Sequence, residues 1–314
     1  MKKGVKTAII AAAVCIAAGC VLMGAGAAAG GRRQLAEGDF NYIHMDDMDL
    51  EESGLLSLIG RELFSDGGYY DGEKETKGVE VLDGNFEQDI SYNGDLKRLE
   101  IKIGVHGLEI VESGGRGIHI EGKNCDRIQC YVKDGTLYVR DVGKNKRYTK
   151  INNRELVLTV PEGICWEKVN IDTGLGYVNL GTLEAEKAEL TAELGTIEIE
   201  NLCAGQTDME AELGSIEVKD ASIGKLDVSA EMGNVELRGS LEGDADVEAN
   251  MGNVKLDLSQ NREDFNYEIT AGMGSVTLDG ADYSGMSREK KIDNGAKWKM
   301  ELNSSMGSID IYFE

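Results

Sequence analysis

Proline, aromatic residues, histidine and positive charge are all scarce in this 314-residue chain. Pro161 is its one proline, so the 41 glycines must turn most corners of the backbone. Aromatic side chains make up only 6% of the residues, and a packed core must therefore be mainly aliphatic. The formal charge of −24 excludes a nucleic-acid-binding surface as the main role, because such surfaces are built from lysine and arginine.

Catalytic motifs are also missing. There are three histidines, His44, His106 and His119, and none has a second ligand at zinc spacing, so we interpret them as ordinary surface or strand residues. The sequence contains no nucleophile-elbow motif, no P-loop and no dinucleotide-binding glycine fingerprint in a strand–helix context. We therefore predict no catalytic residue, no cofactor-binding residue and no enzyme activity.

The dominant feature is a repeated phrase in the C-terminal half. Six copies begin with AELGTIEI at residues 192–199 and end with SSMGSIDI at residues 304–311, and a weaker copy, TGLGYVNL, occupies residues 173–180. The shared glycines are Gly176, Gly195, Gly214, Gly233, Gly252, Gly274 and Gly307. Their spacings are 19, 19, 19, 19, 22 and 33 residues, and a period near twenty is typical of a solenoid.

Within one repeat the apolar residues alternate with polar ones. Ile197 and Ile199 flank Glu198, which is the period-two pattern of a half-buried strand. We predict an all-β fold, a parallel β-solenoid or β-helix with rungs of about 19 residues, each made of two or three short strands. Helical repeats are the alternative, but no repeat offers ten residues of helical period. We expect the glycine to supply a left-handed or tightly bent backbone, and the Leu or Met before it to fill a corner of the core.

Shorter strand patterns precede the repeats from about residue 80. Residues 99–103, 108–110, 118–121, 136–139 and 156–160 all read as strands. Asn93-Gly94 and Asp134-Gly135 are turn pairs that suit hairpins or tight solenoid corners. Residues 79–314 are therefore expected to form one β-solenoid domain, with regular repeats over 171–314 and a β-rich region before them. Residues 34–78 read as an acidic stalk with one short helix around 55–64.

The chain begins with a basic segment, residues 1–6, followed by 25 uncharged residues, 7–31. As a helix that stretch would be about 37 Å long, enough to cross a bilayer. We predict that residues 1–33 are a basic N-terminus and a single-pass signal anchor, and that residues 34–314 lie outside the cell membrane. A cleaved signal peptide and a lipoprotein modified at Cys20 are alternatives.

Four cysteines lie beyond the predicted anchor: Cys125, Cys130, Cys165 and Cys203. An extracytoplasmic location permits disulfides, and Cys125 and Cys130 could close a small loop. Free buried thiols are the other interpretation, and the one we favour; for Cys203 a small buried residue is an adequate explanation.

Stacked rungs would align carboxylates in two rows about 4.8 Å apart. The first row holds Glu193, Glu212 and Glu231 and ends at Asn250; the second holds Glu198, Glu217 and Glu236 and ends at Lys255. Stacked like charges repel, and a hard divalent cation would relieve the repulsion. The rows are therefore a candidate site for weakly bound Ca²⁺, and the alternative is a solvated face that keeps the protein soluble.

Three motifs together resemble the bacterial putative-adhesin domain family. They are the strand VKDGTLYV at residues 132–139, the turn VPEG at 160–163 and the first rung IDTGLGYV at 171–178. The resemblance covers about residues 80–314, and the wider spacings after Gly252 and Gly274 depart from it. It implies a membrane-anchored, extracytoplasmic β-solenoid of the bacterial envelope, associated with adhesion or envelope stress, and brings no catalytic residues. A cell-wall or protein partner is expected, and a polysaccharide-active lyase or hydrolase is the alternative.

Overall fold

The computed structural model describes residues 69–70, 73–91, 96–115, 117–142, 146–147, 154–283 and 288–313. These residues form an all-β structure, as predicted, and the one helical element among them is the short 3-10 turn η2 (Arg262–Asp264). No helix in the described ranges is long and apolar enough to cross a membrane. The predicted anchor at 7–31, the stalk helix at 55–64 and the turn pair Asn93-Gly94 lie outside the described residues.

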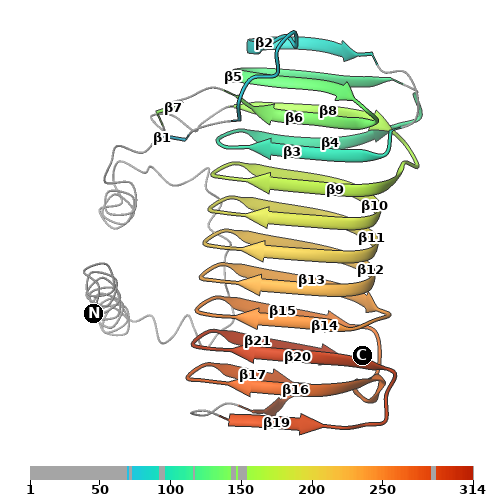
Figure 1. The fold of residues 1–314 in the computed structure, drawn as a ribbon, viewed down its shortest axis with the longest axis vertical. Helices are drawn as coiled ribbons and strands as arrows, with labels where there is room; N and C mark the ends of the chain where they lie inside the picture. The colour runs from blue at the N-terminus through green and yellow to red at the C-terminus, as the bar shows by residue number, and fades with distance from the viewer. Residues whose placement is uncertain are drawn as a thin grey trace. The chain divides into compact units, whose positions relative to one another are not determined.

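The centre of the structure is a regular stack of parallel coils (Figure 1). It is built from β9 (Cys165–Thr173), β10 (Tyr177–Ala192), β11 (Thr196–Ala211) and β12 (Ser215–Ala230). Each residue of β10 and β11 pairs with the residue nineteen positions later, so that Ile197 lies on Ile216. This register is the period of the sequence repeat. In β10, β11 and β12 the predicted separate strands are one bent strand of 16 residues, with a tight turn at the glycine. In the coils that follow, short separate strands are present as predicted.

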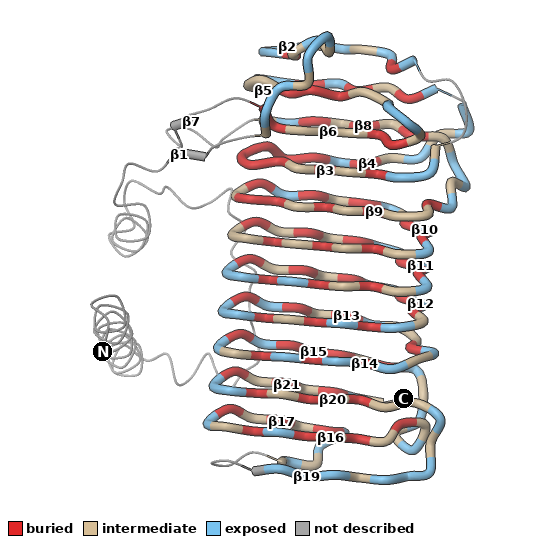
Figure 2. The backbone as a smooth tube through the Cα atoms, in the orientation of Figure 1, coloured by how far each residue is buried: buried red, intermediate tan, exposed pale blue. Residues whose placement is uncertain are grey.

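The core lies between the two sides of each coil. Figure 2 shows buried and more exposed residues alternating along the strands. In β11, Ile197 and Ile199 are fully buried, whereas Glu198 between them is half-buried on the outer face. Alanine, valine, leucine and isoleucine fill almost all the interior positions of the regular coils, which agrees with the low aromatic content. Each coil thus buries its apolar side chains against the coils above and below it.

The shared glycines are required by close approach and not by a left-handed backbone, so that part of the prediction is wrong. The residues with positive φ do not include any of these seven glycines. A Cβ added at Gly214 would lie 2.3 Å from the carbonyl oxygen of Gly195 and 3.1 Å from the Cβ of Ala192. The same clash with the neighbouring turn recurs at Gly195, Gly233, Gly252, Gly274 and Gly307. Only glycine lets successive turns stack at the spacing of a parallel sheet.

Replacing Gly214 with Ala is expected to lower the free energy of unfolding by about 1–3 kcal/mol, because the added methyl group must push two turns apart. Gly181→Ala is the matched control, since Gly181 lies in the same type of coil with nothing within 4 Å of an added Cβ. Thermal and urea unfolding of both variants measures the difference. A Gly214→Ala melt that matches the Gly181→Ala melt would show that the turns have room to spare.

At the N-terminal end of the stack, spatial order departs from sequence order. The strands here are β2 (Leu82–Ile90), β3 (Arg98–Ile103), β4 (Gly107–Ser113), β5 (Ile118–Lys133), β6 (Thr136–Asp141) and β8 (Glu155–Pro161). The β3–β4 coil lies between β9–β10 on one side and β6 and β8 on the other, all in parallel. β5 then pairs antiparallel with β6 and β8, and β2 pairs antiparallel with β5 as the outermost strand. A separate pair joins β1 (Tyr69–Tyr70) to β7 (Lys146–Arg147).

The predicted turn at Asp134-Gly135 is confirmed. It joins β5 to β6 in a two-residue hairpin, with φ values of 50° and 73° at Asp134 and Gly135. Positive φ at both central residues is the type I′ geometry that Asp-Gly favours.

At the C-terminal end the last repeat is inserted between two earlier ones. The strands are β13 (Asn234–Leu241), β14 (Ala245–Ala249), β15 (Asn253–Leu258), β16 (Phe265–Ala271), β17 (Ser275–Leu278), β18 (Ala281–Asp282), β19 (Arg288–Ile292), β20 (Trp298–Ser304) and β21 (Ser308–Phe313). β20 lies between β14 and β16, and β21 lies between β15 and β17 (Figure 1). The segment around η2 leads the chain past this level, and the wider spacings of 22 and 33 residues reflect this detour. β18 and β19 close the end by antiparallel pairing.

Cysteine pairs test this order directly. Asn253 is the Cα partner of Ser308, and Ser308 is the partner of Ser275, so Asn253 and Ser275 are two levels apart. Neighbouring levels are separated by about 4.8 Å, which suits a disulfide, and two levels by about 10 Å, which does not. In a Cys165→Ser, Cys203→Ser background, the pair Asn253→Cys with Ser308→Cys should oxidise to a disulfide. The control pair Asn253→Cys with Ser275→Cys should remain reduced in non-reducing mass spectrometry; its oxidation would mean that the repeats stack in sequence order.

Two further expectations about single residues are corrected. The side chains before the glycines do not fill the core: Leu213 and the four methionines Met232, Met251, Met273 and Met306 are all exposed. Leu or Met at that position points away from the coil, because the turn itself is too narrow to cover it. The four cysteines form no disulfide with one another, and Cys125 and Cys130 are buried as expected for structural thiols, whereas Cys165 and Cys203 are exposed. Burial raises the pKa of the Cys130 thiol to about 12, so it is unreactive at neutral pH.

Candidate functional site

The second predicted carboxylate row is aligned by the backbone register. Glu198 is the Cα partner of Glu217, which is the partner of Glu236, and Glu236 is followed by Lys255. Lys255 Nζ lies 2.8 Å from Glu236 Oε1 and closes the row with an opposite charge. Glu217 has a carboxylate on each side, and burial, together with the negative charges of Glu198 and Glu236, raises its pKa. This row therefore has one unfavourable carboxylate in the middle and a neutralised end.

The first row follows the stacked turns. Glu212 donates its backbone N–H to Ala192, and Glu231 and Asn250 repeat this bond one and two coils further on. Burial raises the pKa of Glu193, and the nearby charges of Asp172 and Glu212 add to the effect. Asn250 ends the row by donating from Nδ2 to Glu231 Oε1 at 3.0 Å. Ca²⁺ binding by these two rows of carboxylates remains a prediction.

Glu217→Gln should stabilise the fold by a few tenths of a kcal/mol at neutral pH, because it removes the repelling charge between two others. A raised folded pKa means that protonation of Glu217 favours the fold at low pH, and that this contribution is lost as the pH rises above the ordinary value of 4.5. Glu236→Gln is the matched control and should destabilise, because Lys255 loses the closer of its two carboxylate partners and keeps only Asp257 at 3.3 Å.

The calcium prediction uses the same proteins. If Ca²⁺ binds the rows, it should raise the melting temperature of the parent more than ionic-strength-matched NaCl, and the excess should shrink in Glu217→Gln. Equal increases of the melting temperature in CaCl₂ and in NaCl would show that the rows do not bind Ca²⁺ and are only a solvated surface.

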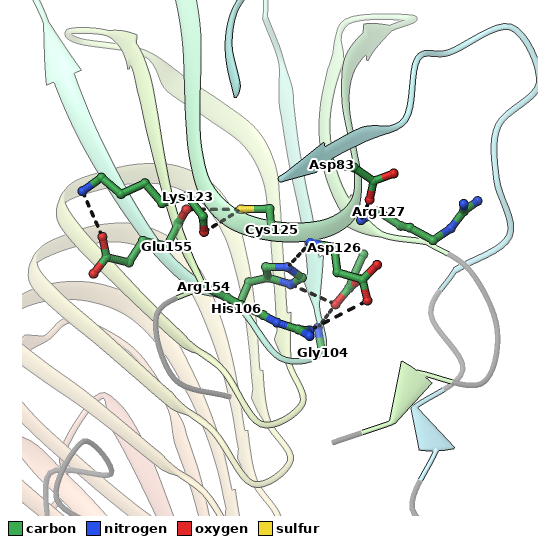
Figure 3. Close-up of polar contacts among 10 residues, drawn as sticks. Asp83, Gly104, His106, Lys123, Cys125, Asp126, Arg127, Arg154 and Glu155 are labelled. Atoms are coloured by element: carbon green, nitrogen blue, oxygen red, sulfur yellow. Dashed lines mark hydrogen bonds and ion pairs between the residues drawn. The ribbon is translucent and has the colours of Figure 1, made fainter. Parts of the chain in front are cut away.

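A buried histidine–aspartate pair lies at the N-terminal end of the stack (Figure 3). His106 and Asp141 are both fully buried, and His106 Nδ1 lies 3.1 Å from Asp141 Oδ2. The backbone N–H of Asp126 donates to His106 Nε2 at 3.1 Å, so the imidazole proton must be on Nδ1, where it is donated to Asp141. Gly104 also donates its N–H to Asp141 at 3.2 Å. With Nε2 already accepting a bond, His106 joins the β3–β4 turn to β5 and β6 and is not free to act as a base.

His119 lies instead on the outer face of the terminal β2–β5 pair. Its Nδ1 is 2.8 Å from Asp89 Oδ1, and its Nε2 is 3.6 Å from Glu87 Oε1 and 3.5 Å from Glu121 Oε1. The hydrogen bond to Asp89 raises the pKa of His119, and the charges of all three carboxylates add to it. Sequence spacing did not reveal this group, because Glu87 and Asp89 come from a strand 30 residues earlier. Glu87, His119 and Glu121 offer ligand atoms within 4.8 Å of one another.

A groove of about 500 Å³ is lined by residues of β12, β13, β15 and β21. It forms where β13 is one residue short relative to β12, which brings Gly239, at φ 143°, opposite Ala221. Arg238, Asp257 and the exposed Tyr312 line it. Arg238 Nε is 3.2 Å from Asp257 Oδ2, and Lys255 Nζ is 3.3 Å from the same oxygen. Asp257 is therefore held as an ion-paired carboxylate.

The exposed side chains before the glycines form a continuous line, which we call the edge row. In order along the stack it contains Leu213, Met232, Met251, Met306 and Met273. Backbone hydrogen bonds connect the turns in that order, from Met251 to Glu231, from Met306 to Asn250 and from Met273 to Ser305. The exposed fraction of these side chains runs from 39% at Leu213 to 70% at Met273. Insertion of the last repeat places Met306 between Met251 and Met273, so the order of the methionines along the stack differs from their order in the sequence.

Solved structures that resemble this chain share little sequence with it. A "putative adhesin" from Bacteroides fragilis is 15% identical, with 74% of this chain and 100% of that chain covered and a TM-score of 0.39. A "putative cell adhesion protein" from Clostridium sporogenes is 17% identical, with coverages of 75% and 100% and a TM-score of 0.32. A "putative lipid binding protein" from Parabacteroides distasonis is 16% identical, with coverages of 76% and 98% and a TM-score of 0.40.

Among curated proteins, no match is found. The family model described as Toastrack DUF4097 matches residues 96–312, which is more than half of the chain and includes β3 to β21. The function of that family is unknown, and the match confirms the family resemblance that the sequence motifs indicated. This chain belongs to the Toastrack DUF4097 family.

Proposed function

We propose that this protein is a membrane-anchored, extracytoplasmic interaction protein of the bacterial envelope, and that it has no catalytic activity. Residues 7–31 would hold it in the membrane, and the stacked coils would present binding surfaces to a partner outside the cell. The single observation that carries the proposal is the edge row. Soluble proteins seldom expose a contiguous line of large apolar side chains without a binding role.

The edge row favours a protein partner over a wall polymer. Its methionines are flexible and polarisable, and such side chains adapt to different apolar contacts. On one side of the four methionines the neighbouring positions are uncharged: Asn234, Asn253, Ser308 and Ser275 follow the glycines in stacking order. On the other side, Glu231 before Met232 is the one charged neighbour. These amides and hydroxyls form a ladder, with Ser308 Oγ donating to Asn253 Oδ1 at 2.7 Å. An apolar line bordered by neutral hydrogen-bonding groups suits a protein segment that offers both.

The printed names of two similar solved structures refer to adhesion and that of a third to lipid binding. Those names describe the other proteins. They fit a binding role for this chain, and its place in a family of unknown function is compatible with one.

A polysaccharide-active enzyme is the alternative, and the groove near Gly239 is where it would act. A glycosidase requires two carboxyl groups flanking the scissile bond, one of them able to give up or take a proton. Asp257 is held by Arg238 and Lys255, and Asp220 is the second carboxylate that lines the groove. Oδ2 of Asp257 already contacts both the Arg238 guanidinium and the Lys255 ammonium group, so this carboxylate is occupied by contacts within the protein. The groove therefore supports an interaction protein better than it supports a hydrolase.

A photo-reactive amino acid placed at Met251 tests the proposal in living cells. Illumination should give one discrete protein adduct, because Met251 lies in the middle of the edge row. Protease added to wall-stripped cells should then degrade both the domain and the adduct. The matched control is the same amino acid at Glu248, which is exposed in the same coil but lies on the strand β14 rather than on the edge. Equal labelling at the two positions, or protection from the protease, would contradict the proposal.

Purified protein incubated with wall polysaccharides should release no oligosaccharide. Release that disappears in an Asp257→Asn variant would establish the enzyme alternative instead.

A further inference from the structure

The backbone of the terminal strand pair brings four side chains into a compact group on one outer face. Glu87 is the Cα partner of Glu121, and Asp89 is the partner of His119. Their strand neighbours Ile90, Ile118 and Ile120 are buried, so the four polar residues all point outward. We call Glu87, Asp89, His119 and Glu121 the cap cluster. Because pairing and alternation fix it, its composition does not depend on the flexible ends of the side chains.

Among the residues that the structure describes, no lysine or arginine forms an ion pair with the cap cluster. On the other flank of β5, His119 faces Thr159 and Glu121 faces Val157. Lys123, the next outward residue of β5, is paired with Glu155 at 3.2 Å. Three carboxylates therefore share one imidazole, and two of them, Glu87 and Glu121, lie directly opposite each other, which is unfavourable in an antiparallel pair.

Hydrogen-bond chemistry indicates what the cap cluster lacks. With Nδ1 donating to Asp89, the lone pair of Nε2 converges with oxygens of Glu87 and Glu121. When Nε2 carries no proton, all three atoms are acceptors, and a cation placed among them would relieve their repulsion. A proton on Nε2 can be donated to only one carboxylate oxygen at a time, whereas a metal ion can bind Nε2 and both carboxylate oxygens together. A carboxylate on the second ring nitrogen is the usual support of a metal-binding histidine.

We propose that the cap cluster is a binding site for a zinc-like divalent transition-metal ion, with His119 Nε2, Glu87 and Glu121 as ligands and Asp89 as the support of His119. Metal–ligand bonds of about 2.0–2.2 Å at tetrahedral angles place ligand atoms about 3.3–3.6 Å apart. In the structure, His119 Nε2 lies 3.5 Å from Glu121 Oε1 and 3.6 Å from Glu87 Oε1. Mg²⁺ and Ca²⁺ prefer an all-oxygen shell of six to eight ligands, so the imidazole favours zinc over them.

The bound ion would join β2 to β5 at the exposed end of the stack. β2 is the outermost strand there, and its pairing with β5 is irregular between Leu82 and Phe86. An ion held by Glu87 from β2 and by two residues from β5 would link the two strands by side chains as well as by the backbone. The fourth ligand position faces solvent, where a water molecule or a group from a partner can occupy it.

Isothermal titration of the full chain with Zn²⁺, compared among variants, tests the site. The parent should bind one more equivalent of Zn²⁺ than His119→Gln, and Asp89→Asn should weaken that equivalent about 10–100-fold without abolishing it. Glu248→Gln is the matched control and should bind as the parent does, because Glu248 is exposed on β14 and belongs to neither carboxylate row. The exposed thiols Cys165 and Cys203 are present in every variant and cancel in the comparison.

The double variant Glu87→Gln with Glu121→Gln should also lose the extra equivalent, and thermal melting without metal should show that it remains folded. Co²⁺ provides a second measurement, because tetrahedral Co²⁺ gives visible absorption that the His119→Gln protein should not show. Equal Zn²⁺ affinity and stoichiometry in the parent and His119→Gln would overturn the proposal. So would an unchanged Zn²⁺ affinity in Asp89→Asn together with octahedral Co²⁺ absorption.

Discussion

The whole stack depends on how closely one turn approaches the next. The carbonyl oxygen of one shared glycine lies very close to the position that a Cβ on the next would occupy. A Cβ built on Gly214 would lie 2.3 Å from the carbonyl oxygen of Gly195. That approach lets the strands on both sides of the coil keep parallel hydrogen bonding without a break. Because the coils of β10, β11 and β12 share a nineteen-residue path, inward residues fall on inward residues, and the core continues from coil to coil. The outer rows of carboxylates, amides and methionines result from the same register.

The two ends of the stack need a different solution, because a parallel stack exposes unpaired strand edges. At the N-terminal end β5, β6 and β8 lie between β2 and the β3–β4 coil, although they follow both in the sequence. At the C-terminal end β20 and β21 lie between the two coils that precede them in the sequence. Antiparallel strands then close the structure: β2 at one end, and β18 and β19 at the other. β19 contains Glu289, Lys290 and Lys291, and charged residues on an edge strand discourage pairing with another molecule. Among the described strands, β16 and β17 are connected by pairing to the coils before them only through β20 and β21, so residues 298–313 join the last level to the stack.

The chemistry of the molecule is divided between the regular coils and the ends. The coils carry repeated surfaces, such as the edge row, on which no single residue is distinguished from its neighbours. The N-terminal end carries both described histidines, each with its own environment. His106 is buried and fully hydrogen-bonded, whereas His119 lies among carboxylates that it cannot satisfy alone. A solenoid end has a unique sequence and an antiparallel pairing, so it can bring unlike residues together, which a repeating face cannot do.

The sequence by itself determined the strand class, the coil length and the positions of the glycines. Alternation such as Ile197-Glu198-Ile199 and the nineteen-residue period are local signals, and local signals fix which residues point inward and which coil follows which in the regular part. Alignment of Glu198, Glu217 and Glu236 follows from that period. The sequence could not show that the glycines are needed for contact rather than for a left-handed backbone, because both requirements select the same residue.

Tertiary structure decided the remainder. Only strand pairing places Met306 between Met251 and Met273, since the insertion of residues 298–313 depends on which edge is free when that segment folds. The same is true of His119, whose neighbours Glu87 and Asp89 lie on a strand that pairs with β5 in the opposite direction. The sequence also did not reveal that the methionines are exposed. They lie in narrow turns that cannot cover their side chains, and the width of a turn is a property of the folded chain. The periodicity of the sequence predicts which residues of a coil point inward and which point outward. Long-range strand pairing decides which residues from distant parts of the chain contact one another.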